Sequence, residues 1–437
     1  MSNRRIGNTK VIIIIMILIL VLSSCQLSRD ASEEQQEIEL SVWIERWFSP
    51  RESIFDFQLS RILKDRFPKL QIHLISSYTR DLKLLKKDLM SNNKYDLIIA
   101  HEYTLPMHYR TGMMSPIYSD GVEQLDQIEE FYLDNIRSMD SEHHELYAVP
   151  IASELIGLYY SPDRMQSLGL PLPEDGMTWQ QLIDYGQSID IKSIFTNKQI
   201  VRHMMSQLGL RLSNPQTNKI DVMNDEWVQF ATIVQELFRV PGNVSLTTTA
   251  LLSHQFNYSV NKYLFEITSL HSSFIRAQIS DEVNYDLVSV PVPDSNTEAG
   301  VEPLMYAAFI HPDSKKQVEA LKVINYLLTP EVQTMLSTSG RGTVLRDEAI
   351  SIMFGSAIRN FDGKNIAALT KYKIVPSNRL GTYISRDLYD VAENVLIRLI
   401  DQSVEQTLEE LDRELNQTLR DEELQIELIN EVKYGHN

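Results

Sequence analysis

The chain has 437 residues, of which 43% are hydrophobic and 23% charged, which is the composition of a globular protein. Its formal net charge of -18 leaves no basic stripe to neutralise phosphates, and so argues against nucleic-acid binding and against electrostatic docking on anionic lipid. Cys25 is the only cysteine, so no internal disulfide can form and a hydrophobic core must hold the fold.

The N-terminus has the pattern of a secretion signal. A basic start precedes an unbroken apolar run over residues 11–22, which is shorter than the roughly 20 residues of a membrane span. Small residues and then Cys25 follow directly, and this order resembles the lipobox of bacterial lipoproteins. The resemblance implies a signal peptide over residues 1–24 and acylation of Cys25, whose two or three acyl chains would anchor the protein firmly. The alternative is an uncleaved N-terminal anchor with an incidental cysteine.

Residues 25–38 are expected to form the lipidated cysteine and a flexible tether, because they are polar and acidic and lack an apolar period. About 410 residues remain after the signal, enough for two or three domains of ordinary size.

Strands and helices then alternate along the first part of the body. Hydrophobic periodicity predicts strands over residues 38–44, 70–74 and 95–100, and helices over residues 53–67 and 80–90. Alternation at these lengths predicts a parallel, doubly wound α/β sheet, in which ligands sit beyond the carboxyl ends of the strands.

Residues directly after two of these strands are therefore placed to face a cleft, although they are equally compatible with ordinary surface loops. They are Glu45, Arg46 and Trp47 after the first strand, and His101, Glu102 and Tyr103 after the third.

Four short motifs in the middle of the chain carry a family resemblance. They are Glu-Leu-Tyr-Ala-Val-Pro at 145–150, Gly-Leu-Tyr-Tyr-Ser-Pro-Asp-Arg at 157–164, a Gly-Leu-Pro turn within 168–173, and a Thr-Trp pair at 178–179 that opens a helix. Their order and spacing resemble the extracellular solute-binding proteins of ABC importers, in the branch that includes maltose-binding protein. Thr178 suits the N-cap of that helix.

Later segments fit the same resemblance. Residues 285–294 are similar to the family's strand ending in a Pro-x-Pro turn, 301–310 to its return strand, 315–329 to the helix before the second domain resumes, and 407–419 to its closing helix. The region 261–274 departs from the pattern because it has no Trp to stack on sugar. His271 or Phe274 could substitute there, or could be an ordinary surface and core residue.

The resemblance implies an α/β fold of the two-lobe, periplasmic-binding-protein-like type II, with doubly wound sheets joined by hinge crossings. Lobe one would hold residues 39–149 plus 301–328, and lobe two residues 150–300 plus 329–437. Ligand would bind between the lobes and close them, shifting the balance only by its greater affinity for the closed form.

The implied function is that of a monomeric, lipid-anchored binding protein on the extracytoplasmic face of the cell membrane. It would capture a small solute, expected to be a carbohydrate, and deliver it to ABC permease subunits, with no cofactor, metal or nucleic acid involved. A lipoprotein that presents ligand to a membrane sensor or scaffolds partners would have the same fold.

An enzyme is not expected, because the sequence lacks nucleophile-elbow, zinc-protease, P-loop and dinucleotide-binding motifs. A glycoside-acting enzyme built on Glu102 and Glu154 would rest only on the presence of two carboxylates.

The predicted ligand contacts are Trp47, Tyr103, Glu154 and Arg341. The aromatic pair would stack on a sugar and the charged pair would form directional hydrogen bonds. Trp43 and Tyr306 have suitable chemistry too, and the acidic set that includes Glu45 could instead suit a cationic ligand. Trp179 is expected to pack at a helix start, and Trp227 is assigned to core or cleft with equal weight.

Overall fold

The computed structural model describes residues 38–46, 54–76, 95–140, 142–188, 200–214, 217, 219–240, 264–269, 284–294, 299–374 and 386–434. The predicted signal and tether up to residue 37, Trp47, the helix expected at 80–90, and both His271 and Phe274 lie outside the described residues.

A five-stranded sheet organises the first part of the fold, in the order β2-β1-β3-β11-β4. Its strands are β1 (Ser41–Arg46), β2 (Gln71–Ser76), β3 (Leu97–His101), β4 (Val149–Glu154) and β11 (Leu304–Ile310). The three predicted N-terminal strands pair in parallel as expected, whereas the return strand β11 runs antiparallel to both β3 and β4. All five residues of β3 are buried, as is typical of a strand covered on both faces.

Helices from three parts of the sequence pack around this sheet and form the first hydrophobic core. They are α2 (Ile54–Arg66), α4 (Leu105–Arg110), α5 (Glu130–Arg137), α14 (Gln317–Leu327), α15 (Pro330–Thr338) and α16 (Glu348–Ile352). The predicted helices at 53–67 and 315–329 are thus confirmed as α2 and α14. Leu59 and Leu63, one turn apart on α2, are fully buried, which explains why the apolar stripe of the sequence located this helix correctly.

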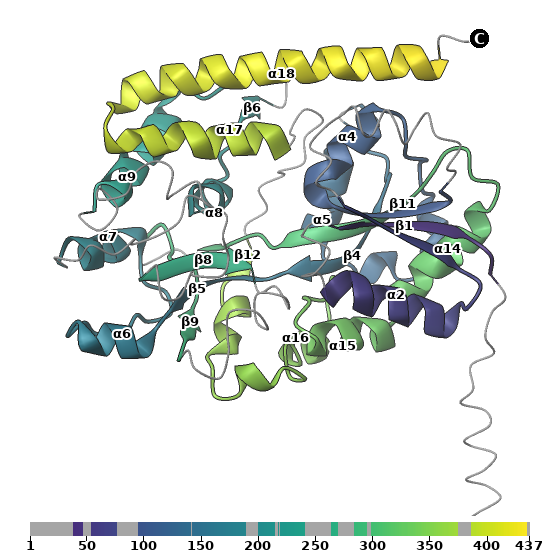
Figure 1. The fold of residues 1–437 in the computed structure, drawn as a ribbon, viewed down its shortest axis with the longest axis horizontal. Coiled ribbons are helices and arrows are strands. Elements are labelled where there is room, and N and C mark those ends of the chain that lie inside the picture. The colour runs from purple at the N-terminus through teal and green to yellow at the C-terminus, as the bar shows by residue number, and fades with distance from the viewer. Residues whose placement is uncertain are drawn as a thin grey trace, which may run out of the picture.

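A smaller antiparallel sheet organises the second core, in the order β8-β5-β9. Its strands are β5 (Ile156–Tyr160), β8 (Phe265–Ser269) and β9 (Asp286–Val288). The surrounding helices are α6 (Pro162–Ser167), α7 (Trp179–Gln187), α8 (Ile200–Gln207), α9 (Asp225–Phe238), α17 (Arg386–Leu396) and α18 (Val404–Tyr434). In Figure 1 the two bodies lie side by side, with α18 running along the top of both.

The remaining described elements are short. They are η1 (Glu102–Thr104), η2 (Ser119–Gly121), η3 (Leu125–Gln127), β6 (Ser213–Asn214), β7 (Lys219–Ile220), β10 (Ala299–Gly300), η5 (Arg359–Phe361), η6 (Ile366–Thr370), β12 (Lys373–Ile374) and η7 (Ile397–Ile400).

Local sequence signals set the start of α7. Thr178 accepts a hydrogen bond from the backbone of Gln181, whose side chain accepts one in return from the Thr178 backbone, so the predicted N-cap is confirmed as a full capping box. Trp179 is buried beside this cap and donates to Gln207, as expected for a packing residue. Trp227, for which core and cleft were both open, is 1% exposed and belongs to the second core.

The chain crosses between the cores at Leu155, where β4 passes directly into β5, and again near residues 300–304. Buried residues of the first core continue past residue 328, the expected end of lobe one. Val332, Leu336 and Leu345 are buried in the first core, because the apolar face of α15 packs against α14. On packing alone, the chain leaves the first core after Ile350, while the lobe boundaries themselves remain a prediction.

Candidate functional site

Tyr103 marks the junction between the two cores. The strand that precedes it, β3, lies in the middle of the first sheet and ends at His101, whose ring nitrogen Nδ1 accepts a hydrogen bond from the Tyr103 backbone at 3.4 Å. This tight turn sends neighbouring side chains in opposite directions: Tyr103 is buried in the second core, and Leu105 in the first. The carboxyl end of a central strand, where ligands bind in α/β sheets, therefore touches the other half of the molecule.

Arg202 of α8 lies against two aromatic rings at this junction. Its guanidinium carbon is 4.6 Å from the ring centre of Tyr103 and 5.2 Å from that of Tyr389 on α17, and the two rings are 5.8 Å apart. Its Nη2 also lies 2.7 Å from Glu393 Oε1 and 3.6 Å from Asp390 Oδ1. We name Tyr103, Arg202 and Tyr389 the junction triad.

The charge of Arg202 is fixed by these neighbours. Burial by itself would lower the pKa of Arg202, but Glu393, Tyr103 and Asp390 together raise that pKa above its ordinary value. The junction triad is therefore a permanent cation held against two aromatic faces, an arrangement that gains strength where water is excluded.

A second polar contact lies at the crossing, where β4 ends. Arg341 Nη1 is 2.5 Å from Glu154 Oε1, and the other oxygen of Glu154 accepts a hydrogen bond from Ser269 at 2.8 Å. The side chains of Glu154 and Arg341 are only 1% and 2% exposed, and the guanidinium carbon lies 5.7 Å from the ring centre of Tyr306.

The loop that carries Arg341 is clamped to the crossing by backbone hydrogen bonds. The Ser153 amide donates to the Gly342 carbonyl at 2.9 Å, and the Gly342 amide donates back to the Ser153 carbonyl at 2.8 Å. A Cβ at position 342 would collide with the Ser153 hydroxyl and come within 3.1 Å of Leu155, so only glycine allows this approach.

Two further buried carboxylates bond within the protein near the same strand ends. Glu45 accepts from the Thr104 hydroxyl at 2.5 Å and from the His101 amide at 3.3 Å. Glu102 accepts from the Met305 amide at 2.8 Å. Glu45, Glu102 and Glu154 are the acidic set that was considered for a cationic ligand. All three instead form hydrogen bonds that hold the strand ends against adjacent segments of the protein.

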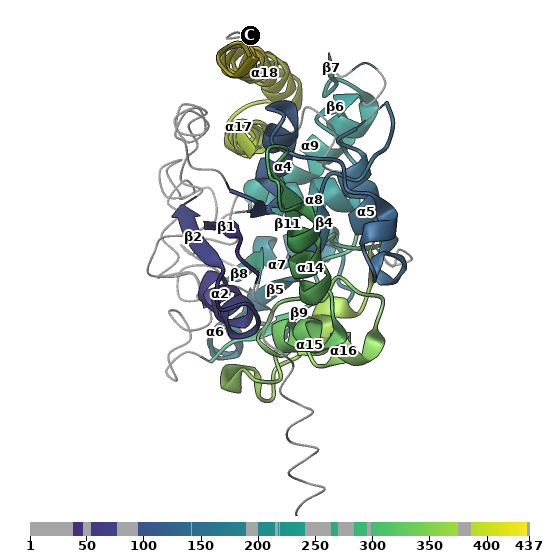
Figure 2. The ribbon, with the colours of Figure 1, turned by 90° about the vertical axis from the view of Figure 1, so that its right-hand side faces the viewer.

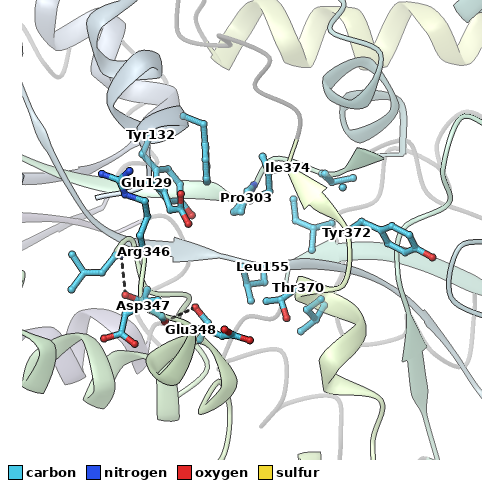
Figure 3. Close-up of a pocket in the computed structure, with 18 of the residues that line it drawn as sticks. Glu129, Tyr132, Leu155, Pro303, Arg346, Asp347, Glu348, Thr370, Tyr372 and Ile374 are labelled. Atoms are coloured by element: carbon cyan, nitrogen blue, oxygen red, sulfur yellow. Dashed lines mark hydrogen bonds between the residues drawn. The ribbon is translucent and has the colours of Figure 1, made fainter. Parts of the chain in front are cut away.

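A cavity of about 900 Å³ lies beside the crossing strands, at Leu155 and at residues 300–303. Figure 3 shows Tyr132 and Arg346 on one side of it, Tyr372 on the other, and Leu155 and Pro303 between them. Residues of both cores line this cavity, but none of the predicted ligand contacts does. Asp347, which also lines it, already accepts hydrogen bonds from the Ala349 and Ile350 amides in the first turn of α16.

The sequence over residues 61–334 matches the family of bacterial extracellular solute-binding proteins. The chain belongs to this family. The match covers more than half of the chain and includes strands of both sheets. A search of the curated proteins gave no match.

Solved structures show the same fold at low sequence identity. An ABC substrate-binding protein from Listeria monocytogenes in complex with cycloalternan has a TM-score of 0.64 at 13% identity, with 88% of this chain and 99% of that chain covered. A solute-binding protein from Thermotoga lettingae bound with α-D-tagatose has a TM-score of 0.66 at 15% identity, covering 87% and 99%. The sugar-binding protein MalE from Xanthomonas citri has a TM-score of 0.64 at 16% identity, covering 89% and 99%.

These comparisons confirm the predicted family and its two-lobe α/β fold. The family and its structural neighbours are binding proteins, which agrees with the prediction that this solute-binding protein is not an enzyme. Within the described ranges, no His, Cys, Asp or Glu side chains are grouped so that they could hold a metal ion. The helices in these ranges include none that is long and apolar enough to cross a membrane.

The structure brings together two of the four predicted ligand contacts, but against each other. Glu154 and Arg341 form an ion pair that is buried from water, and the Gly342 clamp holds their backbones close. Tyr103 belongs to the junction triad, and Trp47 is outside the described residues.

Two other aromatic candidates are core residues. Trp43 is 4% exposed with its ring 5.0 Å from that of Tyr95, and Tyr306 is 2% exposed with its ring 5.0 Å from that of His101.

Sequence reasoning missed Arg202 and Tyr389. The other seven residues of α8 are all buried, a fact that only the structure shows. A cation on such a helix needs a partner of opposite charge or an aromatic face. The sequence gives no means of finding Tyr389, which is 286 positions beyond Tyr103 and meets it only through the tertiary fold.

Proposed function

We propose that this solute-binding protein captures a carbohydrate between its two lobes and delivers it to an ABC importer. The observation that carries the proposal is the junction triad, where Tyr103, at the end of a strand of the first sheet, faces Arg202 and Tyr389 of the second core. A sugar ring has apolar faces that stack on aromatic side chains and hydroxyls that bond to charged groups. The structural neighbours from Listeria monocytogenes and Thermotoga lettingae were solved with carbohydrates bound, which supports this solute class.

We propose that Trp47 and Tyr103 supply stacking faces to the solute, and that Glu154 and Arg341 supply hydrogen bonds. In the conformation described, Glu154 and Arg341 bond to each other, so a solute would reach them by exchanging with one of those bonds. Tyr103 is the member of this set whose surroundings best suit a sugar, because a second ring and a fixed cation lie beside it.

We propose further that the protein is a monomeric lipoprotein, anchored through Cys25 on the extracytoplasmic face of the cell membrane. The position of Cys25 directly after the apolar run and small residues supports this. Two or three acyl chains would keep the binding protein close to its permease. Changing Cys25 to Ser should release the protein from the membrane fraction and abolish labelling by radioactive palmitate. Membrane association in unchanged amount would argue for an uncleaved anchor instead.

Solute identity can be tested on the body purified from Gln26 onward. Native mass spectrometry would detect a co-purified small molecule, and calorimetric titration with a panel of mono- and oligosaccharides would identify carbohydrates that bind. Tyr103→Ala should weaken binding by about tenfold or more, since stacking on an aromatic ring and the cation beside it would be lost.

Tyr118→Ala is the matched control, because that tyrosine is 78% exposed and lies outside the junction triad. Its affinity should equal that of the parent. Equal binding by the Tyr103 variant would exclude the junction as the solute site, and binding of amino acids or peptides but no carbohydrate would exclude the proposed solute class.

A further inference from the structure

Helix α18 reaches from one half of the molecule to the other. It has 31 residues, which at a rise of about 1.5 Å per residue gives a length of about 46 Å. Figure 1 shows it running from above α17 and α9 on one side to above α4 on the other, and Figure 2, which looks nearly along its axis, shows it above α17.

The first part of α18 packs in the second core. Leu408, Leu411, Leu415 and Leu419 recur on one helical face and are at most 7% exposed, packed against α17 and α9. This stripe is the one that the sequence located at 407–419. The helix continues for four further turns past it, and these turns need another reason to be ordered.

The last part of α18 contacts α4, whose inner face belongs to the first core. Glu422 Oε2 lies 3.6 Å from Arg110 Nη1, and each of these side chains is only 10% exposed. About two helical turns further on, Asn430 Nδ2 donates to the Arg110 carbonyl at 3.5 Å. Ile426 and Ile429, between and beside these contacts, are 8% and 3% exposed.

The segment from η1 to α4 is therefore held by the second half of the molecule at both of its ends. Tyr103 at its start stacks on Arg202, and Arg110 at its end pairs with Glu422. Between them, Leu105 anchors the segment in the first core. A hinge motion that separates the lobes must pull this segment away from α8, α17 and α18 together.

We infer that residues 421–434 of α18 are a strap that couples the lobes, and that Glu422 and Arg110 are positioning residues which hold Tyr103 against the second lobe. The strap stabilises the closed arrangement before any solute arrives. Solute affinity then depends on the strap, because a ligand that selects the closed form binds more tightly when that form is already populated. This inference rests on the proposed binding of solute between the lobes, but the strap itself can be measured without solute.

The lone cysteine of the chain makes a direct measurement simple. The body from Gln26 onward contains no cysteine, so spin labels can be placed at two chosen sites only. Lys322→Cys on α14 and Gln180→Cys on α7 are exposed positions in the two halves of the molecule. Double electron–electron resonance between these labels reports the distribution of distances between the lobes.

The decisive variants are Glu422→Gln and a chain that ends at Arg420, which keeps all four leucines of the packed stripe. Both should shift the distance distribution of the solute-free protein toward longer values. With a bound solute identified, both should weaken its affinity by about fivefold or more. Glu427→Gln, an exposed change on the same helix, should behave like the parent in both measurements.

The exchange Arg110→Glu with Glu422→Arg should restore part of the parent distribution, which a role of Glu422 in folding alone would not produce. If Glu422→Gln leaves the solute-free distribution unchanged while the protein melts as the parent does, the strap is overturned. If the shortened chain fails to fold, the test rests on Glu422→Gln and on the Arg110→Glu, Glu422→Arg double variant. Because these distances need no ligand, failure of the carbohydrate proposal and failure of the strap are distinguishable.

Discussion

Glu154 and Arg341 are 187 residues apart in the sequence, yet their Oε1 and Nη1 atoms lie 2.5 Å apart, and the two side chains are only 1% and 2% exposed. The pair lies where the chain crosses between the two cores. Ser269 of the second sheet donates a hydrogen bond to the other carboxylate oxygen of Glu154. Removing only one member of such a buried pair costs much stability, because the remaining charge is left without its partner and without water to solvate it.

Arg341→Met should therefore lower the free energy of unfolding by about 3–5 kcal/mol, since it leaves the Glu154 carboxylate buried and uncompensated. Urea unfolding followed by circular dichroism measures the change. Arg359→Met, at an exposed position on η5, should stay within about 0.5 kcal/mol of the parent. A loss no larger in the Arg341 variant than in this control would show that the pair is open to water.

Gly342→Ala should destabilise the protein by about 1–3 kcal/mol, because its Cβ collides with the Ser153 hydroxyl at the backbone clamp. Gly121→Ala is a fair control, since its Cβ would meet only the flexible end of Leu321 at 3.1 Å. Thermal unfolding of both variants gives the comparison. Adding Ser153→Ala to the Gly342 variant should recover part of the loss, and no recovery would mean that the clamp fails for another reason.

His108 should make stability fall with acidification. Burial, and secondarily His311, lowers the pKa of His108 from 6.5 to about 3, and neither ring nitrogen has a hydrogen-bond partner among the described residues. Between pH 6.5 and 3 the unfolded chain takes up a proton that the folded chain excludes, so stability drops by up to about 1.4 kcal/mol per pH unit. Above pH 6.5 this histidine contributes no slope.

His108→Phe, which keeps an aromatic ring between Trp43 and Phe309, should flatten that dependence. Urea unfolding at pH 6.5 and pH 5 should show a loss about 2 kcal/mol smaller in the variant than in the parent. Identical losses in the two proteins would place a charged, hydrated histidine at this position.

Saturating solute should make the protein more compact, because a ligand held between two lobes selects their closed arrangement. Small-angle scattering with and without an identified solute measures the radius of gyration. The chain that ends at Arg420 should show a larger compaction than the parent, since its solute-free form starts more open. An unchanged radius at proven saturation in both chains would contradict a closing cleft.

Much of the fold could be predicted locally. The apolar stripe of α2, the alternation of β1 and β2, and the Thr178 cap of α7 are all determined by residues within one or two turns of each other. The family resemblance also comes from short motifs whose order survives in the sequence. Helix α14 was predicted within two residues at each end, but the packing of α15 on the first core could not be derived, because its apolar face could have docked on either core.

The sequence by itself determined that Tyr103 follows a buried strand, that Glu154 and Arg341 are candidates for directional hydrogen bonds, and that the closing helix has a leucine stripe. Only the tertiary structure decided that Tyr103 meets Arg202 and Tyr389 while Leu105 turns the other way. The physical reason is that strand and helix periods are short-range, whereas burial of a charge requires a partner supplied by a distant segment.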